Sequence, residues 1–214
     1  MFPKNVDSLY VGRVLTIGAA VATVFGTFWV VSGIQASHAP AWFRLPLTAA
    51  LALVALRMAL SCIRLVSSAS LFPPSGDRQA MKRAASYINI ATVIQIVASI
   101  AAPILLSRSG HAGVGFAAVI VTVGLYLIAF APLVRVPHYY VVGGLLTVIP
   151  VLSILLLPAT VVVATGTIQV WTALTGIACG LLYLAFGWAN LLLTARIRRG
   201  QHHHNRSSQA AAIQ

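Results

Sequence analysis

Six long apolar segments alternate with short polar stretches along this chain. They cover residues 14–34, 45–66, 84–106, 112–134, 139–163 and 170–193. Each is long enough, as a helix, to cross a hydrocarbon core of about 30 Å, which takes about 20 residues. None alternates polar and apolar residues as a barrel strand does, and a helix satisfies its own backbone hydrogen bonds in lipid. The pattern predicts an all-α integral membrane bundle of six transmembrane helices.

The polar stretches divide the chain into one membrane domain and a tail. The longest loop, residues 67–83, holds a Pro-Pro-Ser-Gly-Asp turn, and its Asp77 fits an N-cap for the third helix. Near the end of the chain the sequence becomes basic and polar, with three consecutive histidines at 202–204. We predict a six-helix domain over residues 1–195 and a disordered cytoplasmic tail over residues 196–214.

The basic residues predict an orientation. If the N-terminus is cytoplasmic, the outer side keeps only Arg44 and Arg108. The inner side then receives Lys4, Arg13, Arg78, Lys82, Arg83, Arg135, Arg196, Arg198, Arg199 and Arg206. Cytoplasmic flanks carry the excess of Lys and Arg, so we predict both termini in the cytoplasm. The net charge of +12 then indicates contact with anionic lipid at the cytoplasmic face, and no nucleic acid.

Composition agrees with a membrane protein and raises one question of charge. Of the residues, 59% are hydrophobic and 7% charged, and the mean hydropathy is +0.94, which excludes a water-soluble domain. The two acidic residues, Asp7 and Asp77, both lie outside the apolar segments, whereas Arg57 and Arg64 lie inside the second. Arg64 is near the inner end, where its aliphatic stem can snorkel. Arg57 is near the middle, where an arginine costs about 2.5–3.5 kcal/mol, so we expect it to face the bundle interior or a wet cavity.

Four neutral polar residues share the depth of Arg57 or lie in the inner half of their helices. They are Gln95, Tyr183, Tyr126 and Asn190. One interpretation is polar contacts between helices, worth about 0.6 kcal/mol each. The other is a ligand site in which the guanidinium of Arg57 attracts a carboxylate, phosphate, halide or lipid headgroup. The sequence leaves both open, and these five residues are the predicted ligand-binding set.

Two features bear on how the helices pack. Pro150 and Pro158 in the fifth segment predict a kink or a break. If the chain divides into two inverted sets of three helices, this segment corresponds to the second one, as in inverted-repeat transporters. Small residues predict close helix contacts within the bundle, namely Gly18, Gly26 and Gly33 in the first segment and Gly176, Gly180 and Gly187 in the last.

Motifs of enzymes and cofactor sites are missing. There is no HExxH sequence, and Ser109-Gly110-His111 has no acidic partner nearby. Cys62 and Cys179 have no metal spacing and are predicted to pack as small apolar residues. The three tail histidines have no fixed further ligand. We therefore predict no enzyme activity, no cofactor and no metal, and the lack of intramembrane carboxylates argues against a proton or sodium relay.

The stretch over residues 124–143, GLYLIAFAPLVRVPHYYVVG, resembles a recurring segment of a family of uncharacterised six-helix bacterial inner-membrane proteins. The matching positions are Gly124, Leu125, Leu133, Arg135, Pro137, Tyr139, Tyr140 and Gly143. The resemblance implies the six-helix architecture and a bacterial inner membrane, and it brings no established activity.

Two functions follow as hypotheses. The first is a membrane protein that binds, and conducts or exchanges, a small anion or amphiphile through a cavity near Arg57. The second is a non-transporting scaffold or accessory subunit, as a homo-oligomer or with a partner membrane subunit. A wet vestibule that reaches Arg57 would favour the first, and a dry, closed core would favour the second.

Overall fold

Six long helices form the chain. The computed structural model describes residues 8–67, 78–134, 136–163 and 166–211. The helices are α1 (Ser8–Ala36), α2 (Ala41–Ser67), α3 (Arg78–Arg108), α4 (Gly115–Val134), α5 (His138–Leu156) and α6 (Val170–Ala211), with a 3-10 turn, η2 (Ala112–Val114), before α4. Within the described residues, all six contain a stretch long and apolar enough to cross a membrane. This confirms the six predicted helices and indicates an integral membrane protein.

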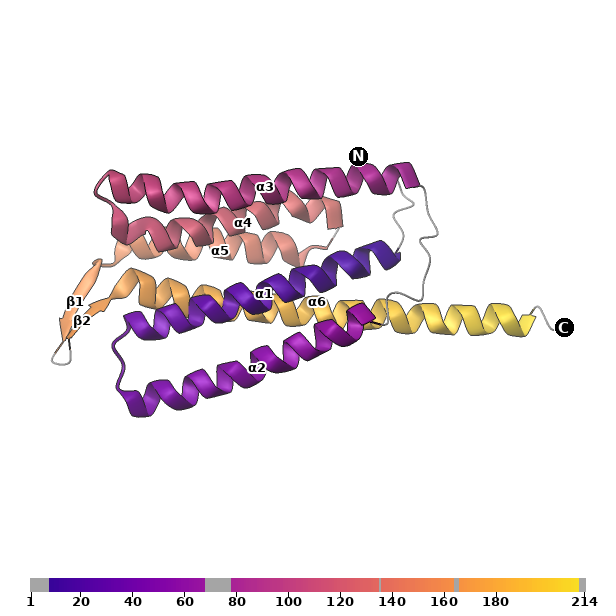
Figure 1. Ribbon diagram of the computed structural model, residues 1–214, viewed down its shortest axis with the longest axis horizontal. Helices are drawn as coiled ribbons and strands as arrows, with labels where there is room; N and C mark the ends of the chain where they lie inside the picture. The colour runs from indigo at the N-terminus through magenta and orange to yellow at the C-terminus, as the bar shows by residue number, and fades with distance from the viewer. Residues whose placement is uncertain (1–7, 68–77, 135, 164–165, 212–214) are drawn as a thin grey trace.

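Contacts link the helices in the order α3, α4, α5, α6, α1, α2. In Figure 1, α3 lies at the top, α2 at the bottom, and α1 crosses α6 between them. α1 begins and α6 ends at the same end of the bundle, which we call the terminal end; the opposite end is the hairpin end. α2 and α3 lie on opposite flanks, whereas α5 and α6 pack together. Two equivalent halves would require α2 to pack on α3 as α5 packs on α6. The arrangement therefore does not have the symmetry that the inverted-repeat hypothesis needs.

Glycines set the closest helix contacts. A Cβ atom added to Gly176 would lie 2.7 Å from the Trp29 carbonyl oxygen, and one added to Gly33 would lie 2.7 Å from the Ile177 backbone nitrogen. The backbones of α1 and α6 therefore touch directly, as predicted for this bundle. Gly124 and Gly143 bring α4 and α5 together in the same way, with an added Cβ on either 2.7 Å from the carbonyl oxygen of the other.

The predicted fifth helix over residues 139–163 is too long at its C-terminal end. α5 stops at Leu156, and Leu157 is extended, with φ −118° and ψ 150°. A two-stranded antiparallel hairpin follows, in which β1 (Thr160–Val163) pairs with β2 (Gly166–Gln169). Thr and Val favour strands, and Pro158 has no backbone N–H for a helix. Pro158 thus lies after α5, while Pro150 is buried inside it.

The polar segment after residue 195 is helical rather than disordered, because α6 continues to Ala211. It extends beyond the other helices at the terminal end (Figure 1). The predicted turn at residues 73–77, with its N-cap Asp77, lies outside the described residues, as does Arg135.

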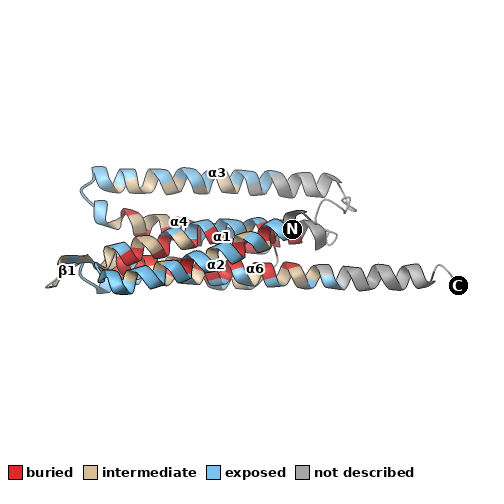
Figure 2. Cartoon of the chain, turned by 60° about the horizontal axis from the view of Figure 1, so that its bottom comes forward, coloured by how far each residue is buried: buried red, intermediate tan, exposed pale blue. Residues whose placement is uncertain are grey.

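Burial separates an inner group of helices from two outer ones. Half of the most apolar 18-residue window of α6 is buried, but none of the corresponding window of α3 is. Figure 2 shows buried residues along α1, α4 and α6 and almost none along α3. The free cysteines Cys62 and Cys179 are both buried, in keeping with the predicted packing role.

Candidate binding cavity

A cavity of about 180 Å³ lies between α1, α3 and α4, and side chains of α5 and α6 complete its lining. Most of its wall is aliphatic or aromatic, and its polar members are Thr92, Gln95, Tyr126, Tyr139 and Tyr183. On the α1 side its wall includes Ile17, Val21 and Phe25, whose side chains are exposed on the bundle surface. The cavity therefore opens sideways between helices.

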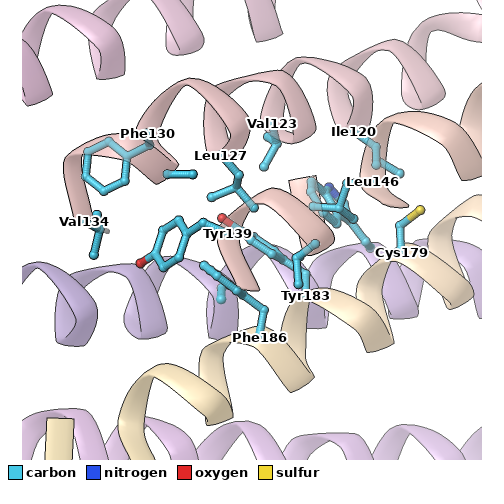
Figure 3. Packing of buried hydrophobic residues seen from close by; sticks show 14 of the residues in the cluster. Ile120, Val123, Leu127, Phe130, Val134, Tyr139, Leu146, Cys179, Tyr183 and Phe186 are labelled. Carbon is cyan, nitrogen blue, oxygen red and sulfur yellow. The ribbon is translucent and has the colours of Figure 1, made fainter. Parts of the chain in front are cut away.

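Tyr183 contributes a hydroxyl without a partner. Its side chain is 4% exposed, and its ring stacks on Trp29 and Phe186 with centroid distances of 5.1 and 5.6 Å. The hydroxyl forms no hydrogen bond with any described residue, although the side chain lines the cavity. Figure 3 shows Tyr183 among Tyr139, Phe186 and Leu127 in the packed interior. A polar atom held in this way is ready to bond to whatever fills the cavity.

Tyr139 is held by a buried hydrogen-bond network. Asn190, fully buried, donates from Nδ2 to the Tyr139 hydroxyl oxygen at 3.3 Å. The Asn190 Oδ1 lies 2.9 Å from His138 Nε2 and accepts a hydrogen bond from it. Because the Tyr139 oxygen is an acceptor, its own proton is free to be donated. Gly18 leaves the space for this group, since an added Cβ would lie 3.2 Å from the Tyr139 oxygen.

A strip of hydrogen bonds joins α3 to α4 beside the cavity. The Thr92 and Tyr126 hydroxyls are 3.3 Å apart, and the Ser99 and Thr122 hydroxyls are 2.9 Å apart. Gln95 Nε2 donates to Ser99 Oγ at 3.1 Å. The Gln95 amide oxygen accepts no hydrogen bond from a described residue. The two hydroxyl pairs thus join the helices, the Gln95 bond lies within α3, and Gln95 and Tyr126 also line the cavity.

Arg57 does not line this cavity. Its side chain is exposed on α2, and its guanidinium carbon lies 5.9 Å from the centroid of the Trp188 ring. The expectation that Arg57 faces the bundle interior is therefore wrong. Met58 belongs to the buried side of α2. Successive residues of a helix point about 100° apart, so the side chain of the neighbouring Arg57 points away from the bundle.

The predicted ligand-binding set is thus divided. Gln95, Tyr126 and Tyr183 share one cavity, Asn190 lies one hydrogen bond behind it, and Arg57 lies elsewhere. Sequence analysis missed Tyr139. The helical spacing of residues in α5 could have indicated it. Tyr139 lies on the same buried face as Val142, Gly143, Leu146, Pro150 and Ser153. No cluster of metal-binding side chains occurs among the described residues.

Comparison with protein-family models, curated proteins and solved structures found no match to this chain. The resemblance of residues 124–143 to a six-helix bacterial family stays a prediction.

Proposed function

We propose that this chain takes a neutral amphiphile from the bilayer into the cavity between α1, α3 and α4. The observation that carries the proposal is the Tyr183 hydroxyl, which has no hydrogen-bond partner among the described residues and belongs to a side chain that is 4% exposed and lines that cavity. A buried polar group without a partner costs about 1–3 kcal/mol. A ligand oxygen that bonds to this hydroxyl would recover part of that cost.

The lining supports an amphiphile over an anion. None of the described residues that line the cavity carries a formal charge, and Arg57 is not among them. Ligand pockets commonly combine an apolar wall with a few polar groups that fix the orientation of the ligand. Here the hydroxyls of Tyr139 and Tyr183 and the amide of Gln95 provide those groups.

The opening supports entry from lipid. Ile17, Val21 and Phe25 are exposed at the α1 side of the cavity, with exposed fractions of 62%, 40% and 42%. An alkyl chain that follows them stays in apolar surroundings. We place the terminal end, where Arg196 and Arg199 are exposed, in the cytoplasm, and the protein in a bacterial inner membrane.

The test measures quenching of tryptophan fluorescence by two brominated probes in the full chain in detergent. Bromododecanol has a hydroxyl and bromododecane has none, and Trp29 reports contact because it stacks on Tyr183. One net hydrogen bond is worth about 1 kcal/mol, so the alcohol is expected to bind about fivefold more tightly.

Two variants make this test specific. Tyr183→Phe should abolish the preference for the alcohol, whereas Tyr140→Phe, at an exposed tyrosine outside the cavity, should keep it. Val21→Phe, at the opening, should weaken both probes equally. A preference for the alcohol that survives in Tyr183→Phe would contradict the proposal.

A second candidate function is an accessory subunit that binds a partner helix. It is favoured by the outer surface of α3, where Ile90, Val93, Ile94, Val97 and Ile100 are all exposed. A lipid-sensitive fluorophore attached to Val97→Cys distinguishes the two. Fluorescence typical of lipid contact in the native membrane would count against a permanent partner at α3.

A further inference from the structure

The outward face of α2 bears a positive charge in apolar surroundings. Leu51, Met58 and Cys62 form the buried stripe of this helix. The opposite side exposes Leu53, Leu56, Leu60 and Ile63. Arg57 is exposed on the same helix, within the apolar stretch Ala41–Leu65. Any molecule that covers this face must accommodate a guanidinium among aliphatic side chains.

The guanidinium N–H groups of Arg57 donate no hydrogen bond to any described residue. Among the described residues, the guanidinium contacts the Trp188 ring, whose centroid lies 5.9 Å from the guanidinium carbon. A cation at this distance from an indole is attracted to it. An aromatic face, however, offers no lone pair for the five N–H donors of a guanidinium. The acceptors must therefore come from outside the described residues, and a molecule that covers this face can provide them.

The position along α2 points to an acceptor that reaches in from the terminal end. Arg57 precedes Leu65, the last residue of the apolar stretch, by eight residues, or about 12 Å along the helix axis. Arg64 is also exposed and lies seven residues beyond Arg57, so both are on nearly one helical face. The second arginine adds a positive charge between Arg57 and the membrane surface. Charged side chains within a bilayer draw headgroups and water inward in this way.

A second copy of the chain does not fit this face. Both acidic residues, Asp7 and Asp77, lie outside the apolar segments. A symmetric contact through α2 would place a second Arg57 near the first, and like charges in a low dielectric repel strongly. A phospholipid fits better. Its phosphate accepts charge-assisted hydrogen bonds from a guanidinium, and its acyl chains can lie along Leu53, Leu56 and Leu60.

We propose that Arg57 and Trp188 form a binding site for the phosphate group of an anionic phospholipid, whose acyl chains cover the outward face of α2. This site is separate from the cavity and does not depend on the function proposed for it.

The test compares two lipids by native mass spectrometry of the full chain. Phosphatidylglycerol carries a phosphate, whereas digalactosyldiacylglycerol has a neutral sugar headgroup and no phosphate. A basic residue near a membrane surface contributes about 1 kcal/mol to the binding of anionic lipid. We therefore expect the chain to retain phosphatidylglycerol about fivefold more than the galactolipid.

Variants assign the preference to a residue. Arg57→Gln should lower the preference for phosphatidylglycerol, and Arg57→Lys should keep more of it, because lysine retains the charge but not the guanidinium fork. Arg108→Gln, at an exposed arginine on the last turn of α3, should behave as the unaltered chain does. Equal retention of both lipids by the unaltered chain, or an unchanged preference in Arg57→Gln, would overturn the proposal. A partner protein whose carboxylate cross-links to the lysine of the Arg57→Lys variant, and which then co-purifies with the chain, would also overturn the proposal.

Discussion

The contact between α1 and α6 differs in kind from the contact between α3 and α4. α1 and α6 approach until backbone meets backbone, because Gly33 and Gly176 carry no side chain. α3 meets α4 through pairs of side-chain hydroxyls, Thr92 with Tyr126 and Ser99 with Thr122. Side chains keep backbones apart, and the space beside such a contact is not filled. The cavity of about 180 Å³ lies on one side of Gln95 and Tyr126, and a groove of about 380 Å³ lies on the other.

The difference indicates separate roles for the two regions. The glycine contact belongs to the rigid centre of the bundle, where almost any added atom must displace backbone. The polar strip holds an outer helix with few buried residues, and it leaves room for another molecule. Three experiments test this difference, in order of decreasing expected effect.

The largest effect is expected for Gly176→Leu. A Cβ at this position would lie 2.7 Å from the Trp29 carbonyl oxygen and 2.8 Å from the Gly33 Cα, so α1 and α6 must separate. Overpacking of this kind costs about 3 kcal/mol or more when backbone has to move. Thermal unfolding in detergent measures the loss. Gly144→Leu is the matched control, because no atom lies within 4 Å of an added Cβ there, and equal stability of the two variants would contradict the backbone contact.

An intermediate effect is expected for Asn190→Leu. The substitution leaves the Tyr139 hydroxyl and the His138 ring without their buried partner. An unsatisfied group as buried as the Tyr139 hydroxyl costs about 1–3 kcal/mol, and the half-buried His138 ring loses less. The same unfolding measurement applies, with Asn89→Leu at an exposed asparagine of α3 as control. A loss no larger than that of the control would show that the network adds nothing to stability.

The smallest effect is expected for the strip between α3 and α4. A double-mutant cycle with Ser99→Ala and Thr122→Val isolates the bond between their hydroxyls, which are 2.9 Å apart. Interhelical hydrogen bonds in membranes average about 0.6 kcal/mol, so the coupling energy should be of that size. Ser61→Ala removes a hydroxyl that bonds only within α2 and serves as the control. A coupling as large as the Gly176→Leu effect would remove the distinction between the two contacts.

Periodicity and residue size predicted a large part of the bundle. The apolar runs located all six helices, because a span must be long and apolar whatever lies beside it. Gly176 and Gly180 correctly indicated close packing against α1. The hairpin was missed because Thr160–Val163 is as apolar as a helix end, and hydropathy does not distinguish a β-branched strand from it.

The candidate site was predicted only in part. Gln95, Tyr126 and Tyr183 were selected for their depth, and they do line one cavity. Arg57 lies near the middle of its apolar stretch, but its side chain does not point inward, because α2 turns Met58 toward the bundle and leaves Arg57 exposed. Neither Tyr139 nor its neighbour Tyr140 was in the predicted ligand-binding set. Of the two, Tyr140 is exposed, and Tyr139 is 2% exposed inside the core.

The sequence by itself determined the class of protein, the number of helices and the position of each polar residue along its helix, because these depend on local composition and on the rise of a helix. Only the tertiary structure decided which helices are neighbours and which side of each helix faces inward. Those choices depend on the summed packing of distant segments, such as Gly33 against Gly176. They separated the charged Arg57 from the neutral tyrosines, and so divided one predicted site into a cavity and an outer surface.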